Sequence, residues 1–419
     1  MEKAIPRLAA LLLCLMIPLL GCTPMEVPAL TEAITTAVIE ATTAAPTTAP
    51  PTTAATEPPT TAAPEPPTTA APEPINIRIT AVGDILLHNT VTNSCQTAGG
   101  GFDFAPLFTH VAPALTGSDI AFVNQEVMLT GEVYNYPRFA APYEVADALK
   151  DAGFNVVNLA TNHTMDRGVE GLEKCIKAVD ARDFDAVLGV FATEEASQTP
   201  ILLEKQGVTF GFLSYTYGLN GIPGPKGKPW MISVLSETDG AVNNARITAE
   251  VEALRPLCDY LIVSMHWGVE YTHTPTKTQK SQAALLAELG VDLVIGHHPH
   301  VVQPLEWIEA EDGHQMLCMY SLGNFVSNQQ RYETMLGGFL EVNLTFDPVS
   351  LKLEATDAGV IPLVTHYSNR KYTTYFLADY TDDLARVHGI ERASAAFSVG
   401  YLDALAQKVL GEMLIFGDR

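Results

Sequence analysis

The densest group of metal-ligand residues in this chain is a histidine cluster that directly follows a short apolar segment. Residues 293–295 are expected to form a buried strand, and Gly296 ends it. A strand holds a histidine at its end rigidly, and neutral imidazole is the commonest metal ligand in proteins. The pattern therefore predicts a cation site, with a loop of merely exposed histidines as the alternative. The histidines are His297, His298 and His300.

Four other apolar segments, each expected to be a strand, end in the same way, with Asp, Glu, Asn or His side chains. The segments are 75–82, 119–123, 154–160 and 260–265. In parallel sheets, side chains just beyond the carboxyl ends of the strands meet in one crevice, where ligands bind. We therefore expect one shared site. The side chains at these ends include Asp84, His88, Glu126, Asn162, His163, Asp166 and His266.

Helices are predicted between these strands, which indicates an α/β architecture. Apolar residues recur at helical spacing over 169–181, 248–257 and 278–289. Segments 339–346 and 351–364 are predicted to be antiparallel strands of a second sheet. Segment 381–416 has a helical pattern without site residues, and we assign it to packing.

The candidate ligands are oxygen and nitrogen donors without a thiolate, a set that favours Mn, Fe or Zn. The candidate ligands are more numerous than one tetrahedral ion can use. A carboxylate such as Glu126 could bridge two ions. Two ions clamp an oxyanion and activate a bound water. His163 is better placed to protonate a leaving group, because Asn162 beside it can take the ligand role. Asp166 would either orient His163 or cap the following helix.

Six short motifs follow one another along the chain: GD-x-x-x-H at 83–88, N-x-E at 124–126, NH-x-x-D-x-G at 162–168, HWG-x-EY at 266–271, G-x-HPHV-x-Q at 296–303 and YSLGNF at 320–325. Their order resembles the CapA family of poly-γ-glutamate capsule synthesis proteins, whose fold is related to calcineurin-like metallophosphoesterases. The resemblance implies a two-sheet β-sandwich flanked by helices, with the metal site on one edge. It implies His163 as the catalytic acid, beside Asp166. The metal ligands that it implies are Asp84, Glu126, Asn162, His266, His298 and His300.

Two departures from the phosphoesterase pattern change the expected roles. Phosphoesterases usually open with D-x-H, whereas His88 follows Asp84 by four positions and is expected to contact substrate. Glu126 stands where those enzymes carry an aspartate. His297 occupies a position that the motif leaves free, and we expect it to be exposed or to lie behind the ligands. The expected substrate contacts are His88, Trp267, Glu270, Tyr271, Gln303 and Asn324.

The first 74 residues are expected to be a secretion and anchoring segment. Residues 1–21 have the layout of a signal peptide and end in a sequence that resembles the bacterial lipobox, so Cys22 is expected to carry lipid. A soluble secreted protein is the alternative. Residues 22–74, rich in Thr, Pro and Ala, predict a disordered linker. The CapA-like domain is then 75–375, with a helical extension at 376–419 packed on it.

The net charge limits which classes of partner the chain can bind, and the cysteine spacing indicates whether disulfides form. Asp and Glu total 48 against 24 Lys and Arg, so the net charge of −24 argues against nucleic acid as a partner. The four cysteines after residue 22 lie far apart. We read them as buried free thiols, with one or two disulfides as the alternative. They are Cys95, Cys175, Cys258 and Cys318.

The sequence thus predicts a lipoprotein on the extracytoplasmic face of the bacterial cell membrane. It would take part in poly-γ-glutamate synthesis, export or anchoring through a metal-dependent, hydrolase-like site, with two divalent ions. One alternative is a phosphoesterase for another extracellular phosphoester. Another is a non-catalytic factor that binds polymer or membrane synthase subunits. Loop 217–230 carries Lys226 and Lys228 and is expected to be a surface loop, with a substrate-facing lid as the alternative.

Overall fold

Strand β1 (Ile75–Ile85) lies at the centre of the fold in the computed structural model, which describes residues 73–235, 244–390 and 397–415. Its apolar side chains are almost completely buried on both faces of the sheet, because another layer covers each face. The predicted signal peptide, Cys22 and the linker up to residue 72 lie outside the described residues.

The first sheet has the strand order β14-β13-β12-β1-β2-β3-β4, with β11 beside the end of β1. Strands β1 to β4 run parallel, whereas β12 to β14 run antiparallel. We expected 339–346 and 351–364 in a second sheet, which is wrong. Strand β12 pairs along β1 from Ile75 to Val82 and satisfies backbone groups that an edge would leave unpaired. The bounds are β2 Ile120–Gln125, β3 Val156–Asn158, β4 Ala186–Leu188, β11 Asn324–Val326, β12 Leu336–Asp347, β13 Lys352–Ser368 and β14 Lys371–Phe376.

The second sheet has the order β5-β6-β7-β8-β10-β9, and its four inner strands run parallel. The carboxyl ends of these parallel strands therefore lie at one edge of the sheet, where β7 ends at His266 and β8 ends at His297. The apolar segments before these two histidines predict this arrangement. The bounds are β5 Ile201–Lys205, β6 Val208–Thr216, β7 Tyr260–His266, β8 Leu293–His297, β9 Leu305–Glu309 and β10 Gln315–Met319.

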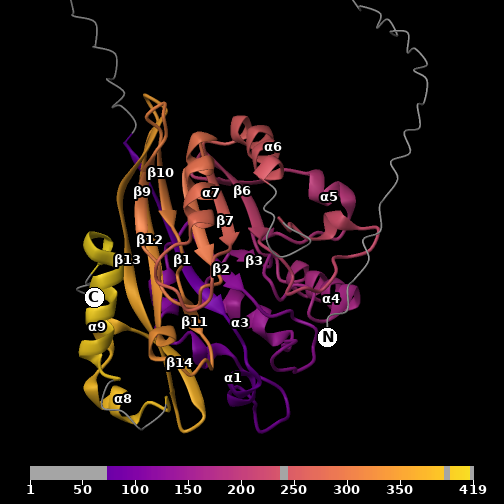
Figure 1. The fold of residues 1–419 in the computed structure, drawn as a ribbon, viewed down its shortest axis with the longest axis vertical. Helices are drawn as coiled ribbons and strands as arrows, with labels where there is room; N and C mark the ends of the chain where they lie inside the picture. The colour runs from indigo at the N-terminus through magenta and orange to yellow at the C-terminus, as the bar shows by residue number, and fades with distance from the viewer. Residues whose placement is uncertain (1–72, 236–243, 391–396, 416–419) are drawn as a thin grey trace, which may run out of the picture. The chain divides into compact units, whose positions relative to one another are not determined.

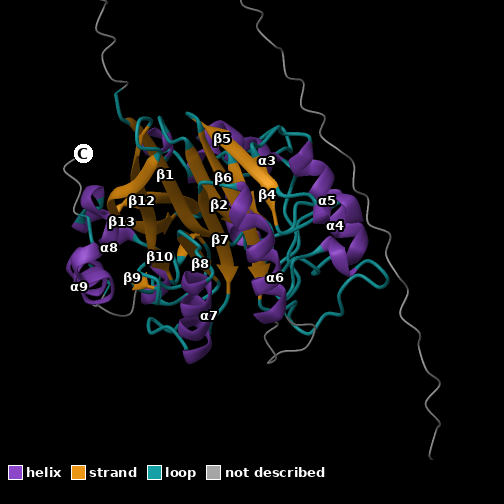
Figure 2. Cartoon of the chain, turned by 90° about the horizontal axis from the view of Figure 1, so that it is seen from above, coloured by secondary structure: helices purple, strands orange, loops and turns teal. Residues whose placement is uncertain are grey.

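Helices cover the outer faces of the two sheets (Figures 1 and 2). Helices α3 and α4 pack on the first sheet, and α6 and α7 pack on β7 and β8 of the second. A third apolar core fills the space between the sheets. The prediction of an α/β sandwich of two sheets flanked by helices is confirmed. The helices are α1 Asn89–Ser94, α2 Ala112–Leu115, α3 Glu144–Ala152, α4 Gly168–Asp180, α5 Glu194–Gln198, α6 Asn244–Leu254, α7 Lys277–Glu288, α8 Asp382–Val387 and α9 Val399–Leu410.

Helix α8 lies near the end of the described segment 244–390, and α9 lies in the described segment 397–415. Leu402, Ala406 and Leu410 follow one another at intervals of four on α9 and join the core between the sheets. Among the described helices, none has the length and apolar character needed to cross a bilayer. The four cysteines predicted as free thiols are free in the structure; three are buried and Cys258 is half-buried.

Candidate metal centre

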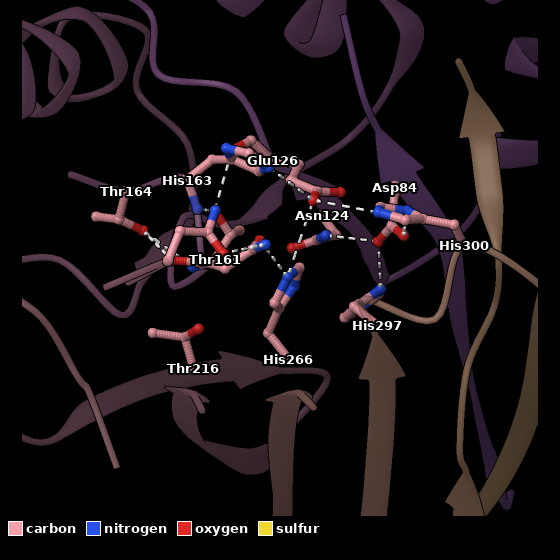
Figure 3. A network of polar contacts seen from close by, with 12 residues as sticks. Asp84, Asn124, Glu126, Thr161, His163, Thr164, Thr216, His266, His297 and His300 are labelled. Carbon is pink, nitrogen blue, oxygen red and sulfur yellow. Dashed lines mark hydrogen bonds and ion pairs between the residues drawn. The ribbon is translucent and has the colours of Figure 1, made fainter. Parts of the chain in front are cut away.

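Side chains from five strand ends meet at one edge of the sandwich (Figure 3). The first sheet contributes the ends of β1, β2 and β3, and the second sheet contributes the ends of β7 and β8. This is the convergence that the apolar segments with polar ends predict. All seven side chains are at most 6% exposed. They are Asp84, Glu126, Asn162, His163, His266, His298 and His300.

Glu126 lies in the middle of the group with no hydrogen-bond partner on either carboxylate oxygen. Three imidazole Nε2 atoms surround its Oε1: that of His300 at 3.8 Å, that of His266 at 3.9 Å and that of His163 at 4.0 Å. These separations are too long for hydrogen bonds. The separations of His300 and His266 from Glu126 suit donors of one shared ion, because metal–donor bonds of about 2.0–2.2 Å place two ligand atoms up to roughly 4 Å apart.

Burial raises the pKa of Glu126 well above its usual value. A fully buried carboxylate without a hydrogen bond is costly in any protein, so natural structures pair such groups or use them to bind metal. The unpaired oxygens of Glu126 therefore fit a cation, and oxygen and nitrogen donors around it fit Mn, Fe or Zn.

Asp84 is held from three sides. Its Oδ2 accepts a hydrogen bond from His300 Nδ1 at 2.9 Å, and its Oδ1 accepts one from Asn124 Nδ2 at 2.8 Å. Burial alone would raise the pKa of Asp84, but its contacts with His297 and His300 outweigh burial and lower the pKa. Asp84 is therefore an ionised carboxylate. Because His300 uses Nδ1 for Asp84, its Nε2 is left to face Glu126.

The imidazoles of His266 and His298 are poised as neutral ligands. Burial lowers the pKa of His266 well below its usual value and that of His298 to about 3. The Nδ1 atoms of both rings are buried without a hydrogen-bond partner. His266 Nε2 lies 2.9 Å from Asn162 Oδ1. Neutral imidazole is the form that binds a metal, so these rings need no deprotonation before an ion binds.

His300 differs from the other two rings. Burial opposes its protonation, but the charges of Glu126 and Asp84 outweigh burial and raise the pKa of His300 to about 9. Without an ion, His300 is thus protonated at neutral pH and compensates the ionised Asp84 carboxylate. An incoming divalent cation would replace this proton and take over the same neutralising role.

The donor atoms form two groups, and within each group all atoms lie within 4.8 Å of one another. The first contains Asp84, Glu126 and His300, as the motifs predict. The second contains His298, His300 and Glu270, for which a substrate contact was expected. Glu270 follows His266 by four residues in the HWG-x-E motif. A carboxylate so close in sequence to a predicted ligand was the signal that could have identified Glu270 as a candidate ligand.

His163 and Asp166 form a buried pair beside Glu126. His163 Nδ1 lies 2.7 Å from Asp166 Oδ2, and the same oxygen accepts a hydrogen bond from the Phe139 backbone N–H at 2.7 Å. The sequence left open whether Asp166 orients His163 or caps the next helix. Helix α4 begins after Arg167 without a side-chain cap, so Asp166 orients His163.

The expected substrate contacts separate into two kinds. Trp267 and Gln303 are buried and bonded inside the protein, the first to the Tyr320 carbonyl and the second to the Thr272 carbonyl. Their hydrogen bonds position the loops after β7 and β8, which corrects the expectation that they contact substrate. Asn324 is also buried, and its Oδ1 lies 3.1 Å from His300 Nδ1. It is placed to orient His300.

His88 and Tyr271 are half-buried beside the centre. The His88 ring lies edge-on to Phe139, which in turn lies edge-on to His163. Burial lowers the pKa of His88 to about 4. The Tyr271 ring centroid is 6.3 Å from that of His300. Both side chains lie where they could border a bound substrate, and their substrate contact stays a prediction.

His297 is fully buried, so the expectation that it could be exposed is wrong. Its ring stacks on Phe122 with a centroid separation of 5.5 Å, and its Nδ1 lies 3.6 Å from Asp84 Oδ1. It lies behind the ligands, which was the other half of the expectation. The apolar residues before Gly296 and the position of His297 at the end of β8 explain the burial.

Sequence reasoning missed a row of polar side chains that links the two sheets. Asn124 donates to Asp84, Asn158 Nδ2 donates to Asn124 Oδ1 at 2.7 Å, and Ser214 of β6 donates to Asn158 Oδ1. All are buried. The signal was Asn158, one of two asparagines in segment 154–160, because a polar side chain in a buried strand needs a partner.

The loop after β6 reaches the centre at one point. Asn220 Oδ1 accepts a hydrogen bond from Asn162 Nδ2 at 3.1 Å. Lys228 lies on the surface, 3.4 Å from Glu173, and does not point to a substrate role. The beginning of loop 217–230 thus borders the site, while Lys228 behaves as part of a surface loop.

A family model described as bacterial capsule synthesis protein PGA_cap matches residues 78–329. The chain is 31% identical to the capsule biosynthesis protein CapA of Bacillus anthracis over 261 residues, which cover 60% of this chain and 60% of that protein. It is 25% identical to the PGA biosynthesis protein CapA of Bacillus subtilis (strain 168) over 337 residues, 78% of this chain and 83% of that one.

Among solved structures, the calcineurin-like phosphoesterase YfkN from Bacillus subtilis aligns with 80% of this chain and 97% of its own, at 12% identity and a TM-score of 0.41.

Proposed function

The chain belongs to the family of bacterial capsule synthesis proteins of the PGA_cap type, and from this premise we propose that it takes part in making, exporting or anchoring poly-γ-glutamate through a metal-dependent, hydrolase-like site. The motif order that resembles CapA supports the polymer. The hydrolase-like part of the proposal depends on the metal centre.

One observation carries the metal-dependent reading. Glu126 is completely buried, both of its oxygens are unpaired, and three imidazole nitrogens lie 3.8–4.0 Å from one of them. A structural carboxylate would be hydrogen-bonded at that depth. The residues that would hold ions are Asp84, Glu126, Asn162, His266, His298 and His300.

A bound divalent ion would supply Lewis-acid stabilisation of an oxyanion and a water of lowered pKa. The chain itself supplies the proton for the leaving group. His163 Nδ1 donates to Asp166, which fixes the ring and leaves Nε2 directed toward Glu126 and the centre. A proton on Nε2 can then pass to the departing oxygen or nitrogen, in the role of a general acid.

Although the chain is acidic overall, one positively charged side chain, Arg331, lies beside Tyr271 at the border of the centre, where it could bind an anionic polymer. The guanidinium carbon of Arg331 lies 4.1 Å from the centroid of the Tyr271 ring, and Tyr271 also accepts a hydrogen bond from Gln329. Arg331 Nη1 lies 3.7 Å from a Glu333 carboxylate oxygen, and the rest of the guanidinium edge can bind a carboxylate or phosphate while the plane stacks on the ring. We propose that Arg331 meets a negative group of the substrate.

We also propose that the protein is held at the outer face of the membrane by lipid on Cys22. The apolar run before it, the sequence that resembles a lipobox and the Thr/Pro/Ala-rich linker support this location. Cys22 and the linker lie outside the described residues. Labelling of cells with a radioactive or alkyne fatty acid should mark the wild type and leave Cys22→Ala unlabelled.

The function is tested by measuring bound metal in the purified chain and then screening phosphoester and γ-glutamyl substrates. We expect a stoichiometric divalent metal and metal-dependent turnover that His163→Ala reduces while the metal stays bound. A chain that folds without any divalent metal would overturn the metal-dependent reading. Normal polymer production in cells that carry His163→Ala, together with its loss on deletion of the domain, would favour the non-catalytic alternative.

A further inference from the structure

We propose that Glu270 is a metal ligand on the solvent side of the centre, where it binds the same ion as His298 and His300. The inference deepens the proposed function, on which it rests, because it requires that the centre binds metal. The motif pattern led us to expect a substrate contact from Glu270. Its position in the structure supports a different role.

The first support is distance. One carboxylate oxygen of Glu270 and one ring nitrogen from each of His298 and His300 all lie within 4.8 Å of one another. His298 is 4% exposed, and its Nδ1 has no hydrogen-bond partner. A buried histidine with an unpartnered ring nitrogen, grouped with a carboxylate and a second histidine, is a set of side chains that suits a metal ion.

The second support is the way in which the two loops are joined. The Tyr271 backbone N–H donates to the Pro299 carbonyl at 2.8 Å, so Glu270 is fixed directly beside the His298–His300 turn. Three non-glycine residues here have left-handed backbone conformations: Tyr271 at φ 63°, His298 at φ 96° and His300 at φ 58°. Such backbone conformations are uncommon for residues other than glycine and gather at functional sites.

The shared histidine decides how the two donor groups relate. His300 belongs to the group with Glu126 and to the group with Glu270. Its Nδ1 is taken up by Asp84, so only Nε2 remains, and one ring nitrogen binds one ion. Glu126 and Glu270 therefore address the ion at His300 from two directions, Glu126 from the buried interior and Glu270 from the exposed surface.

The difference in exposure gives Glu270 a distinct property. The other candidate ligands are buried and fixed by strand ends, whereas the Glu270 side chain is exposed on a loop. An exposed ligand can leave the ion at little cost in packing. Glu270 is thus the ligand that a substrate carboxylate or phosphate would displace.

The test measures binding of Mn²⁺ to the metal-stripped full-length chain in detergent by isothermal titration calorimetry, with bound metal counted by mass spectrometry. The variants are Glu270→Gln and Glu270→Ala. Glu252→Gln is the matched control, because Glu252 is an exposed glutamate on α6, away from the centre. Since Glu270 is exposed, the metal-free variants should melt at the wild-type temperature.

We expect both Glu270 variants to bind the ion at least about tenfold more weakly, as loss of a group that supports a metal typically does, while Glu252→Gln binds like the wild type. Wild-type affinity and stoichiometry in both Glu270 variants would overturn this inference and leave the metal centre standing. A wild-type chain that binds neither Mn²⁺ nor Zn²⁺ would overturn the inference together with the proposed function.

Discussion

Replacing Glu126 by glutamine should change stability in opposite directions with and without metal. In the metal-free protein the Glu126 carboxylate is buried, unpaired and, at high pH, charged. An unsatisfied buried polar group costs about 1–3 kcal/mol, and more when it is charged. Glu126→Gln removes the charge at nearly constant volume. We therefore expect the metal-free variant to be more stable than the metal-free wild type by about 1–3 kcal/mol at pH 8.

The pH dependence of that difference follows from the raised pKa of Glu126. A group whose pKa is higher in the folded than in the unfolded state stabilises the fold below its unfolded pKa of about 4.3, and this contribution is lost as pH rises. The wild type and Glu126→Gln should therefore converge in stability toward pH 4 and diverge toward pH 8. The slope of the difference is at most about 1.4 kcal/mol per pH unit.

Metal should invert the order of the two proteins. A cation at a hundred times its dissociation constant stabilises the wild type by about 2.7 kcal/mol, whereas a variant that cannot bind it gains nothing. Thermal melts with chelator and with Mn²⁺, at pH 5 and pH 8, measure both effects. If Glu126→Gln is destabilised without metal and equally stabilised by Mn²⁺, Glu126 is a structural residue and the reasoning is refuted.

Three further predictions concern other parts of the site and fold. Asp166→Asn should keep bound metal but lower turnover of a phosphoester by about 10²–10⁴-fold, since His163 loses its anionic partner; unchanged turnover would contradict this. Asn158→Ala should weaken Mn²⁺ binding measured by calorimetry, because it removes the link from the second sheet to Asp84, and wild-type affinity would exclude that link. His388 has its pKa lowered to about 4 by burial, so it stabilises the fold above pH 6.5 and this contribution is lost as pH falls toward 4. Chemical denaturation of His388→Gln should show a shallower loss of stability over this pH range than the wild type, and an equal slope would count against the lowered pKa.

Much of the site could be predicted because strands place their ends reproducibly. Each apolar segment that stops at Asp, Glu, Asn or His marks a side chain held at a sheet edge, and parallel strands bring those edges together. This is why Asp84, Glu126 and His266 could be placed in one group before any coordinates were known. The helices between the strands followed from apolar periodicity in the same way.

What the sequence did not predict depends on contacts between segments far apart in the chain. Strand β12 was assigned to the wrong sheet, because alternation shows that a segment is a strand and not which neighbour it pairs with. His297 is a polar residue whose burial depends on Phe122 of the other sheet. Asn158 and Ser214 meet only when the two sheets pack, so no local spacing could pair them.

The structure also redistributes roles within one motif. Trp267, Glu270 and Tyr271 are close in the sequence and were all expected to contact substrate. Their exposure separates them, with Trp267 buried in packing, Tyr271 half-buried beside Arg331, and Glu270 exposed near two histidines. A spacing pattern identifies residues that belong to a site, while depth and neighbouring atoms decide what each of them does.

The most direct measurement is anomalous X-ray diffraction from crystals of the protein grown with Mn²⁺, collected on both sides of the manganese absorption edge. We expect an anomalous peak within bonding distance, about 2.0–2.3 Å, of a Glu126 oxygen and of ring nitrogens from His266 or His300. No peak among these side chains in a crystal that contains Mn²⁺, with both Glu126 oxygens still unpaired, would contradict it.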